Sequence, residues 1–220
     1  EIDVNQHNYT NATPLNMASF YSHVKIVRLL LQQPNIDVNK KDNDLSLLAH
    51  AGKQKNCAIS KLLLDAGAEC TLHEAVSWND IYAVEICLNK NDVNEVDENG
   101  RTSLHIAIEN NYIDIVKRLL LVEGIDLNKT FKGITPLEKA SKQVVSLLLN
   151  AGAECTLHEA VTLNNIDLVK RCLKKDGLNV NQVDENGRTP LIAAIENNYI
   201  EIVKRLLLVK GIDLNTTLVK

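Results

Sequence analysis

The residue types that most often do chemistry in proteins come together in two copies of a Cys-Thr-Leu-His motif, at 70–73 and 155–158. A cysteine and a histidine at this spacing resemble half of a zinc site. In both motifs, however, Cys stands where Thr stands in related parts of the chain. A short motif of this kind matches by chance often enough that we favour a structural role and expect no metal.

The remaining candidates for catalysis also favour structural roles. A Cys-His pair has no obvious third group to orient it. The acidic pairs Asp97-Glu98 and Asp184-Glu185 stand beside Asn-Gly, which is typical of a solvated turn. The nine glycines form neither GxxxxGK nor GxGxxG, so no phosphate-binding loop is indicated. We therefore predict a segment that is not an enzyme and that needs no cofactor.

Internal repeats dominate the chain. A hexad with Leu third and a small residue sixth recurs at short intervals, beginning at Thr13, Ser46, Cys70, Thr102, Thr135, Cys155 and Thr189. A longer period lies above it, because residues 109–128 return almost unchanged as 196–215. A period of about 33 residues indicates stacked structural units rather than one globular core.

Each hexad opens the same helical pattern, which residues 100–128 show best. Thr102 can cap a helix that starts at Ser103, and 110–112 interrupt it. Residues 113–121 then carry an apolar stripe at helical spacing. We expect Gly124 to end this second helix in a left-handed conformation. The unit is thus a pair of helices followed by a turn-rich connection.

This pattern closely resembles the ankyrin repeat. The resemblance rests on the Thr-Pro-Leu triplets that begin at Thr13, Thr135 and Thr189 and on His73, His105 and His158, and it covers essentially the whole chain. It implies an all-α solenoid of about seven helix-turn-helix repeats with β-turn fingers. It also implies that the histidines bond between repeats and that Asn39, Asn94, Asn128, Asn181 and Asn215 have a structural role in turns.

The array is irregular at two places. Gly-Ala-Glu-Cys runs directly into Thr-Leu-His at 67–70 and 152–155, so we expect the finger to be missing there and the groove wall to be notched. The repeat from Thr135 is also clipped between its helices. We expect two short helices with a tight turn; one continuous helix over 136–150 is the alternative. This repeat buries the least and is the expected soft point.

Bulk composition narrows the class of protein. The net charge of −4 argues against sequence-independent binding of nucleic acid, which needs a basic face. No apolar run reaches the roughly 20 residues of a membrane span. The five cysteines do not form a disulfide framework, which favours reduced thiols in the cytoplasm. We expect residues 1–220 to form a single array within a longer protein, since neither end resembles a polar capping repeat.

The resemblance implies that a partner binds along the fingers and the ends of the first helices. The candidate residues are Phe20, Tyr21, Lys53, Ser77, Trp78, Glu98, Glu109, Asn110, Leu163, Glu185, Glu196 and Asn197. Trp78 and the Phe20-Tyr21 pair are candidate anchors, and the alternative is that they pack on the neighbouring first helix. Glu95, Asp97 and Asp184 add to an acidic groove, with Lys-Arg pairs at the back.

We therefore predict a monomeric protein-interaction module that receives a segment that is basic at one end and apolar at the other. The first alternative is a targeting module for an enzyme elsewhere in the polypeptide, such as a secreted microbial effector acting in the host cytosol. A nucleotide or oligonucleotide sensor would have to use Lys53 beside Trp78 and Tyr21. A structural spacer without a ligand is the last possibility.

Overall fold

The computed structural model describes residues 3–9, 12–41, 45–184 and 186–214, and every regular element in this part of the chain is a helix. The chain forms two compact units, residues 1–126 and 127–220. That both belong to a single array stays a prediction from the sequence. None of the described helices is long and apolar enough to cross a membrane.

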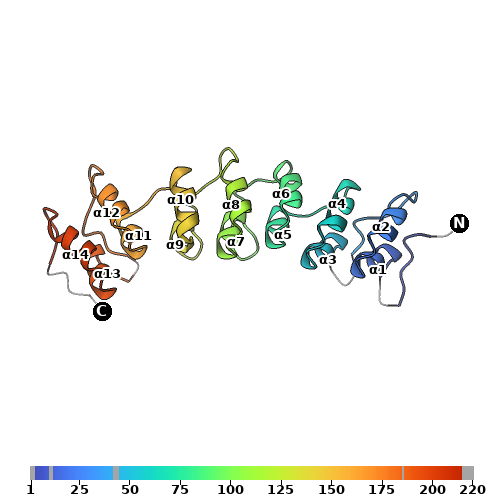
Figure 1. Ribbon diagram of the computed structural model, residues 1–220, viewed down its shortest axis with the longest axis horizontal. Helices are drawn as coiled ribbons and strands as arrows, with labels where there is room; N and C mark the ends of the chain where they lie inside the picture. The colour runs from blue at the N-terminus through green and yellow to red at the C-terminus, as the bar shows by residue number, and fades with distance from the viewer. Residues whose placement is uncertain (1–2, 10–11, 42–44, 185, 215–220) are drawn as a thin grey trace. The chain divides into compact units, whose positions relative to one another are not determined.

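Unit 1 holds four helix pairs, drawn from blue to green in Figure 1. They are α1 (Pro14–Phe20) with α2 (Val24–Leu30), α3 (Leu47–Lys53) with α4 (Cys57–Asp65), α5 (Leu72–Ser77) with α6 (Ile81–Leu88), and α7 (Ser103–Glu109) with α8 (Ile113–Leu119). The first helices pack side by side, α1 on α3 and α5 on α7, and the second helices form a row of their own.

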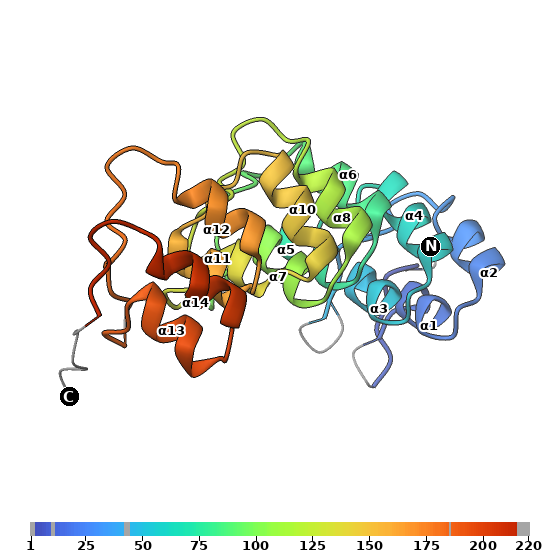
Figure 2. The same ribbon diagram turned by 60° about the vertical axis from the view of Figure 1, so that its left-hand side comes forward.

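Unit 2 holds three pairs, drawn from yellow to red in Figure 2. They are α9 (Pro136–Lys139) with α10 (Lys142–Asn150), α11 (Leu157–Thr162) with α12 (Ile166–Cys172), and α13 (Pro190–Glu196) with α14 (Ile200–Leu207). Here α11 packs on both α9 and α13. The expected all-α helix-turn-helix architecture is therefore confirmed, with a helix pair at each of the seven predicted positions.

The first helices begin where the hexads predict, with two exceptions. Thr13, Ser46, Thr102, Thr135 and Thr189 each accept a hydrogen bond from the backbone of the third helical residue. In the Cys-Thr-Leu-His motifs the cap is Thr71 or Thr156, one residue after the cysteine. The prediction that cysteine replaces the capping Thr was therefore wrong. A hydroxyl accepts a backbone N–H far better than a thiol does, so the helix starts one residue later.

The turn between the paired helices requires a left-handed residue, and Asn111 supplies it in the α7–α8 pair with a φ of 54°. Asparagine tolerates this conformation better than most residues. The end of α8 differs from the prediction, because the helix stops at Leu119 and its C-cap is Leu120. Gly124, with a φ of 79°, lies in the following turn and does not end the helix.

The core of each unit lies between successive pairs. Leu15, Leu104 and Leu137, at the third hexad place, are buried, as are Ala75 and Ala107 at the sixth. These side chains are covered only when the neighbouring pair is present, because a single pair cannot enclose them. Stacking is thus what stabilises the fold.

Asparagine side chains tie the connections of successive repeats together. Asn94 Nδ2 donates to the Gly124 carbonyl at 2.7 Å, and its Oδ1 accepts the Asp126 N–H at 2.7 Å. Asn181 makes the same two bonds to Gly211 and Asp213, each at 2.8 Å. The implied structural role is confirmed at these positions. Asn215 lies outside the described residues.

The clipped repeat forms two helices, as predicted. The first, α9, has four residues, and Ala140 then adopts an extended conformation with a ψ of 140° before α10 begins. The alternative of one continuous helix over 136–150 is excluded. The expectation that this repeat is a soft point is not tested by the geometry and stays a prediction.

Candidate functional site

An exposed apolar cluster lies in unit 1, at the end of the first helix α1. Phe20 and Tyr21 are 52% and 57% exposed, and Met17, one turn earlier, is 37% exposed. The rings of Phe20 and Tyr21 meet edge to face at 5.3 Å. We call Met17, Phe20 and Tyr21 the aromatic patch. It is the kind of surface on which a partner can bury apolar area.

Neighbouring side chains hold the aromatic patch in place. The Tyr21 ring stacks on His23 at 5.9 Å, and the Phe20 ring packs edge to face on His50 of α3 at 6.2 Å. Gln54 donates from Nε2 to the Phe20 carbonyl at 3.0 Å. The two aromatic rings are therefore oriented before any partner arrives, which lowers the entropic cost of binding. Lys53 is exposed beside this contact.

Trp78 does not belong to an exposed site. It is only 8% exposed, and it packs so closely on Gly52 of α3 that a Cβ atom at Gly52 would lie 2.3 Å from Trp78 Cδ2. The prediction of an exposed Trp78 anchor was therefore wrong, and packing on the neighbouring first helix is what the structure shows. Its counterpart Leu163 is half-buried.

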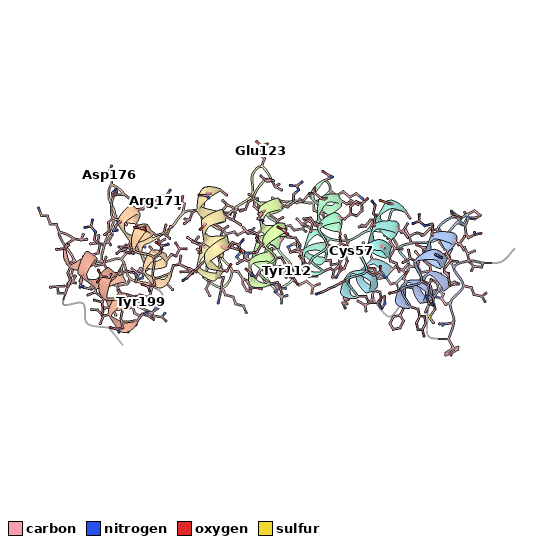
Figure 3. The ribbon with its side chains drawn as sticks, viewed as in Figure 1. Cys57, Tyr112, Glu123, Arg171, Asp176 and Tyr199 are labelled. Atoms are coloured by element: carbon pink, nitrogen blue, oxygen red, sulfur yellow. The ribbon has the colours of Figure 1, made fainter. Side chains whose placement is uncertain are left out.

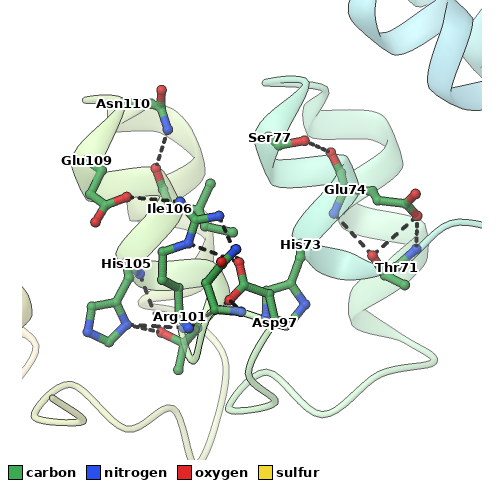
Figure 4. Close-up of polar contacts among 12 residues, drawn as sticks. Thr71, His73, Glu74, Ser77, Asp97, Arg101, His105, Ile106, Glu109 and Asn110 are labelled. Carbon is green, nitrogen blue, oxygen red and sulfur yellow. Dashed lines mark hydrogen bonds and ion pairs between the residues drawn. The ribbon is translucent and has the colours of Figure 1, made fainter. Parts of the chain in front are cut away.

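The fingers carry arginines that change the expected charge. Arg101 lies 2.8 Å from Asp97 Oδ2 through its Nη2 and 3.3 Å from Glu109 Oε2 through its Nη1 (Figure 4). Arg188 repeats this arrangement with Asp184 at 2.7 Å and Glu196 at 3.2 Å. In each of these two arrangements, one arginine thus pairs with an aspartate of the finger and with a glutamate at the end of the following first helix. The predicted acidic groove overestimated the charge, because it left these arginines out.

The pKa of Asp97 lies below its ordinary value. Partial burial opposes this shift, but hydrogen bonds from the Arg101 backbone and side chain and from the Asn99 backbone outweigh it. Asp184 is shifted in the same direction by the equivalent groups. These carboxylates cap a tight turn, in which the Gly100 N–H donates to the Asp97 carbonyl at 2.9 Å. Their role is structural, as expected for solvated turns.

Glu95 and Glu98 remain as uncompensated charges on the finger of unit 1. Both side chains are exposed, and within the described residues neither has an ion-pair partner. The electrostatic role of Glu98 toward a partner stays a prediction. Glu185, its counterpart in unit 2, lies outside the described residues.

The other predicted site residues lie exposed at the ends of first helices. Ser77 donates to the Glu74 carbonyl at 2.7 Å, as Figure 4 shows. Asn110 and Asn197 donate to the carbonyls of Ile106 and Ala193 at 2.9 and 2.8 Å. These bonds close the last helical turn. All three side chains are partly committed to their own helix and offer less to a partner than the aromatic patch.

The histidines of the two motifs bond across repeats, as the resemblance implies. His73 Nε2 donates to the Glu95 carbonyl at 3.0 Å, and His158 Nε2 donates to the Gln182 carbonyl at 2.6 Å. Each links a first helix to the next finger. Within the described residues no three His, Cys, Asp or Glu side chains gather in a way that could hold a metal ion.

Beside the missing finger at 152–155, unit 2 has an open cavity of about 670 Å³. Its lining includes Glu154, His158 and Lys139, together with Lys132 and Arg188 from the connections before α9 and α13. That this space notches a groove wall stays a prediction. The sequence predicted the missing finger but not the cavity itself. It gave no clear signal for Met17, Arg101 and Arg188.

These features define a class of protein built from stacked helix pairs that exposes the ends of its first helices and the connections between pairs. The model of ankyrin repeats matches residues 1–72, 72–159 and 143–217. The chain therefore belongs to the ankyrin repeat family.

Solved ankyrin repeat domains share this fold. The domain of Bcl-3 aligns with a TM-score of 0.69 and 24% identity, covering 88% of this chain and 98% of that one. The domain of human ASB11 aligns with a TM-score of 0.60 and 22% identity, covering 96% and 89%. At this level of identity the likeness concerns the fold alone.

Curated relatives come from diverse sources. Alpha-latrocrustotoxin-Lt1a of Latrodectus tredecimguttatus is 31% identical over 94% of this chain, and the transient receptor potential channel A1 of Drosophila melanogaster is 23% identical over 94%. The chain spans only 13% and 18% of these two proteins. A putative ankyrin repeat protein of fowlpox virus, FPV223, is 35% identical over 48% of this chain and 82% of its own length.

Proposed function

We propose that this chain is a protein-recognition module whose partner docks on the first helices and fingers of unit 1. Ankyrin repeat domains generally mediate protein–protein interaction, so the question is where and through which side chains. The observation that carries the proposal is the aromatic patch, three large exposed side chains at the end of α1, of which the Phe20 ring packs on His50 of α3. Aromatic anchors of this kind dominate interface energetics.

The partner's chemistry follows from what lies along the same row of first helices. Glu95 and Glu98 stand just before α7, and α3 and α5 lie between them and α1. Packed helices are about 8–10 Å apart, so the aromatic patch and the two glutamates are separated by roughly 25–30 Å. An extended peptide covers this distance in about eight or nine residues. The proposed ligand is a segment with an apolar side chain at one end and lysine or arginine at the other.

Selection of peptides from a random display library on the immobilised chain tests this. We expect enriched peptides to carry an aromatic or aliphatic residue and a basic residue about eight positions apart. Binding should fall at least about tenfold in Phe20→Ala and Tyr21→Ala, because each truncation removes a hot-spot contact. Leu29→Ala is the matched control, since Leu29 is 61% exposed but lies on the second helix α2.

A separate experiment tests the proposed attraction between the glutamates and the basic end of the ligand. Glu98→Lys should slow association of a selected peptide and make its rate less sensitive to salt, because steering acts mainly on the on-rate. Glu123→Lys is the control: Figure 3 shows Glu123 in the connection after α8, away from the first helices. Equal effects of both variants would refute the electrostatic part. If the enriched peptides bind Phe20→Ala and Tyr21→Ala as tightly as they bind the native chain, the binding site lies elsewhere. If no peptides are enriched, the alternative of a structural spacer without a ligand is favoured.

The alternatives carry less support. A nucleotide sensor needs an exposed aromatic surface beside Lys53, and the burial of Trp78 removes most of it. A targeting role for an enzyme or effector elsewhere in the polypeptide is compatible with the same aromatic patch. We also propose a cytoplasmic setting, because all five cysteines are free thiols.

A further inference from the structure

Two cysteines that are far apart in the sequence come together behind each missing finger. In unit 1, Cys70 lies in the connection before α5 and Cys87 in the last turn of α6. Their sulfur atoms are 2.8 Å apart, and Cys87 Sγ also donates to the Cys70 carbonyl at 3.3 Å. Non-bonded sulfurs do not normally approach so closely, and a disulfide requires about 2.05 Å. The fold therefore already brings the two sulfur atoms close to bonding distance.

Unit 2 contains the corresponding residues, although Cys155 Sγ donates there to the Thr156 carbonyl at 3.4 Å. Cys172, in α12, donates to the Cys155 carbonyl at 3.4 Å, which matches the Cys87–Cys70 contact. Lys175 Nζ also reaches the Cys155 carbonyl, at 3.1 Å. Lys90 and Lys175 occupy corresponding places, three residues after Cys87 and Cys172. The whole set of two thiols and a lysine thus occurs in both copies.

Each pair opens onto a small cavity. One of about 210 Å³ is lined by Cys70, Cys87 and Lys90. The other, of about 190 Å³, is lined by Cys155, Cys172 and Lys175. Both are large enough for a reagent of a few atoms, although Cys87 and Cys172 are themselves only 2% exposed. A bulky oxidant would be excluded, and a peroxide would not.

The local environment activates one thiol in each pair. The hydrogen bond from Cys155 and the nearby Lys175 charge lower the pKa of Cys172 to about 7, although burial opposes the shift. The pKa of Cys87 is lowered in the same way by Cys70 and Lys90. The partner thiols keep their protons, since a second thiolate beside the first is disfavoured and the pKa values of Cys70 and Cys155 are raised. In each pair the thiolate form is therefore favoured at one sulfur, and the thiolate is the nucleophile that sulfur oxidation requires.

We propose that Cys70–Cys87 and Cys155–Cys172 are two peroxide-sensitive dithiol sites, each of which closes reversibly to a disulfide within its own repeat. The thiolate attacks one oxygen of hydrogen peroxide, giving a sulfenic acid and hydroxide, which takes up a proton to form water. The partner thiol then attacks the sulfenic sulfur, forming the S–S bond and releasing the second water. Two thiols are oxidised by two electrons and the peroxide is reduced to two waters.

The cross-link would act at the irregular part of the repeat. It joins the fingerless connection to the second helix, across 17 residues that include the whole first helix. Because it restricts the unfolded chain, it should stabilise the repeat. Cys155 also lines the open cavity of unit 2, so its bridge would fix part of that lining.

The test uses the full 220-residue chain carrying Cys57→Ser, which removes the one exposed cysteine and leaves four thiols. After treatment with hydrogen peroxide, free thiols are counted in denaturant and the linkages are mapped by mass spectrometry of unreduced peptides. We expect all four thiols to disappear, with linkages 70–87 and 155–172 only, and dithiothreitol to restore them. The oxidised chain should melt at least about 4 °C higher.

A second variant tests whether each cysteine pair closes specifically and not through general oxidation of thiols. In Cys57→Ser/Cys70→Ser the pair 155–172 should still close, while Cys87 should stop at a sulfenic acid, which dimedone traps when the oxidised chain is unfolded in its presence. The reduced melting curve of this variant shows whether it is folded. Cross-linked dimers, linkages between the two pairs, or four thiols that survive peroxide in the folded chain would each overturn the proposal. Stoichiometric retention of zinc by untreated protein, with no disulfide on oxidation, would also overturn it, in favour of a metal site.

Discussion

The chain contains two versions of the same three-repeat cassette, α3–α8 in unit 1 and α9–α14 in unit 2, and they differ most at the first helix. In the first cassette α3 has seven residues and places Gly52 under Trp78. In the second cassette α9 has only four residues, so it lacks the sixth helical position that Gly52 occupies. Leu163 replaces the tryptophan there. The comparison indicates that the tryptophan and the glycine on which it packs occur together in the first cassette and are both missing from the second.

Trp78→Ala should give the largest loss of stability in the comparison. The side chain is almost fully buried against a glycine, so truncation leaves a cavity that the helices cannot easily close. We expect the free energy of unfolding to fall by about 3–5 kcal/mol. Leu163→Ala should cost only about 1–2 kcal/mol, because that leucine is half-buried.

Urea denaturation followed by circular dichroism measures both variants. Fluorescence cannot be used for the comparison, since Trp78 is the only tryptophan. Equal losses of unfolding free energy in the two variants would show that the helices close over the alanine at position 78. The packing of Trp78 on Gly52 would then add nothing to stability.

The second difference concerns the capping glutamates. Glu159 is buried, with 2% exposure, and accepts hydrogen bonds from the Thr156 backbone and from the Thr135 hydroxyl of the preceding repeat. Glu74 is exposed and bonds only to Thr71 of its own helix. Glu159→Ala should therefore cost about 1–3 kcal/mol, since it removes a buried acceptor and takes this partner from two donors in part-buried contacts.

Glu74→Ala is the matched control, with an expected cost of about 0.5–1 kcal/mol for one weakened cap. The double variant Thr135→Ala/Glu159→Ala completes a thermodynamic cycle with the two single ones. A coupling energy near zero between positions 135 and 159 would mean that the contact between repeats does not contribute to stability.

Gly52→Ala should have an effect whose sign depends on residue 78. In an exposed helix interior the change usually stabilises by about 1 kcal/mol. Here the new Cβ would meet the Trp78 ring at 2.3–2.7 Å, so something must shift, and overpacking of this kind costs about 1–3 kcal/mol. We expect a net loss in the native sequence and no loss, or a gain, in a Trp78→Leu background.

The comparison of Gly52→Ala in the two backgrounds by thermal melting tests the paired change directly. A loss of the same size in both backgrounds would mean that the alanine is harmful for another reason, such as backbone strain at position 52.

The repeats and helix pairs could be predicted from the sequence because they depend on local rules. A hydroxyl before an apolar period starts a helix, and an asparagine in the turn permits a left-handed residue. The missing fingers were also visible, since a deletion changes the spacing between hexads. These features need no knowledge of neighbouring repeats.

The errors arose where a residue depends on a side chain from elsewhere. Trp78 has a typical groove position, and only the glycine on another helix makes it a core residue. In the sequence, the acidic residues of the finger appeared to have no counter-charge. In the structure, the folded turn brings Arg101 to Asp97, and Arg101 also pairs with Glu109, eight residues away. The Cys70–Cys87 contact likewise spans 17 residues and two elements. Residue spacing along one helix carries no information about such contacts.

The smallest expected effect concerns an ion pair that only the first cassette has. Arg118 of α8 binds Glu85 of α6 through two nitrogens, at 2.5 and 2.8 Å. In the second cassette Lys170 occupies the place of Glu85, and it pairs with Asp167 of its own helix. The hydrogen bond and charge of Arg118 lower the pKa of Glu85 from its ordinary value of 4.5, although slight burial opposes the shift.

A group whose pKa is lowered by folding contributes stability above its unfolded pKa and loses it as the pH falls through the folded value. Glu85→Gln should therefore destabilise the chain at pH 7 by no more than about 1 kcal/mol, because the pair is half exposed and screened. The difference from the native chain should shrink below about pH 4.5 and vanish once Glu85 is protonated. Urea titrations between pH 7 and pH 3 measure it. Glu123→Gln, which removes an exposed carboxylate with no ion-pair partner in the described part of the chain, should show no such pH-dependent difference. A Glu85→Gln deficit that persists at pH 3 would mean that the side chain stabilises by packing along α6, and that charge does not distinguish the two cassettes here.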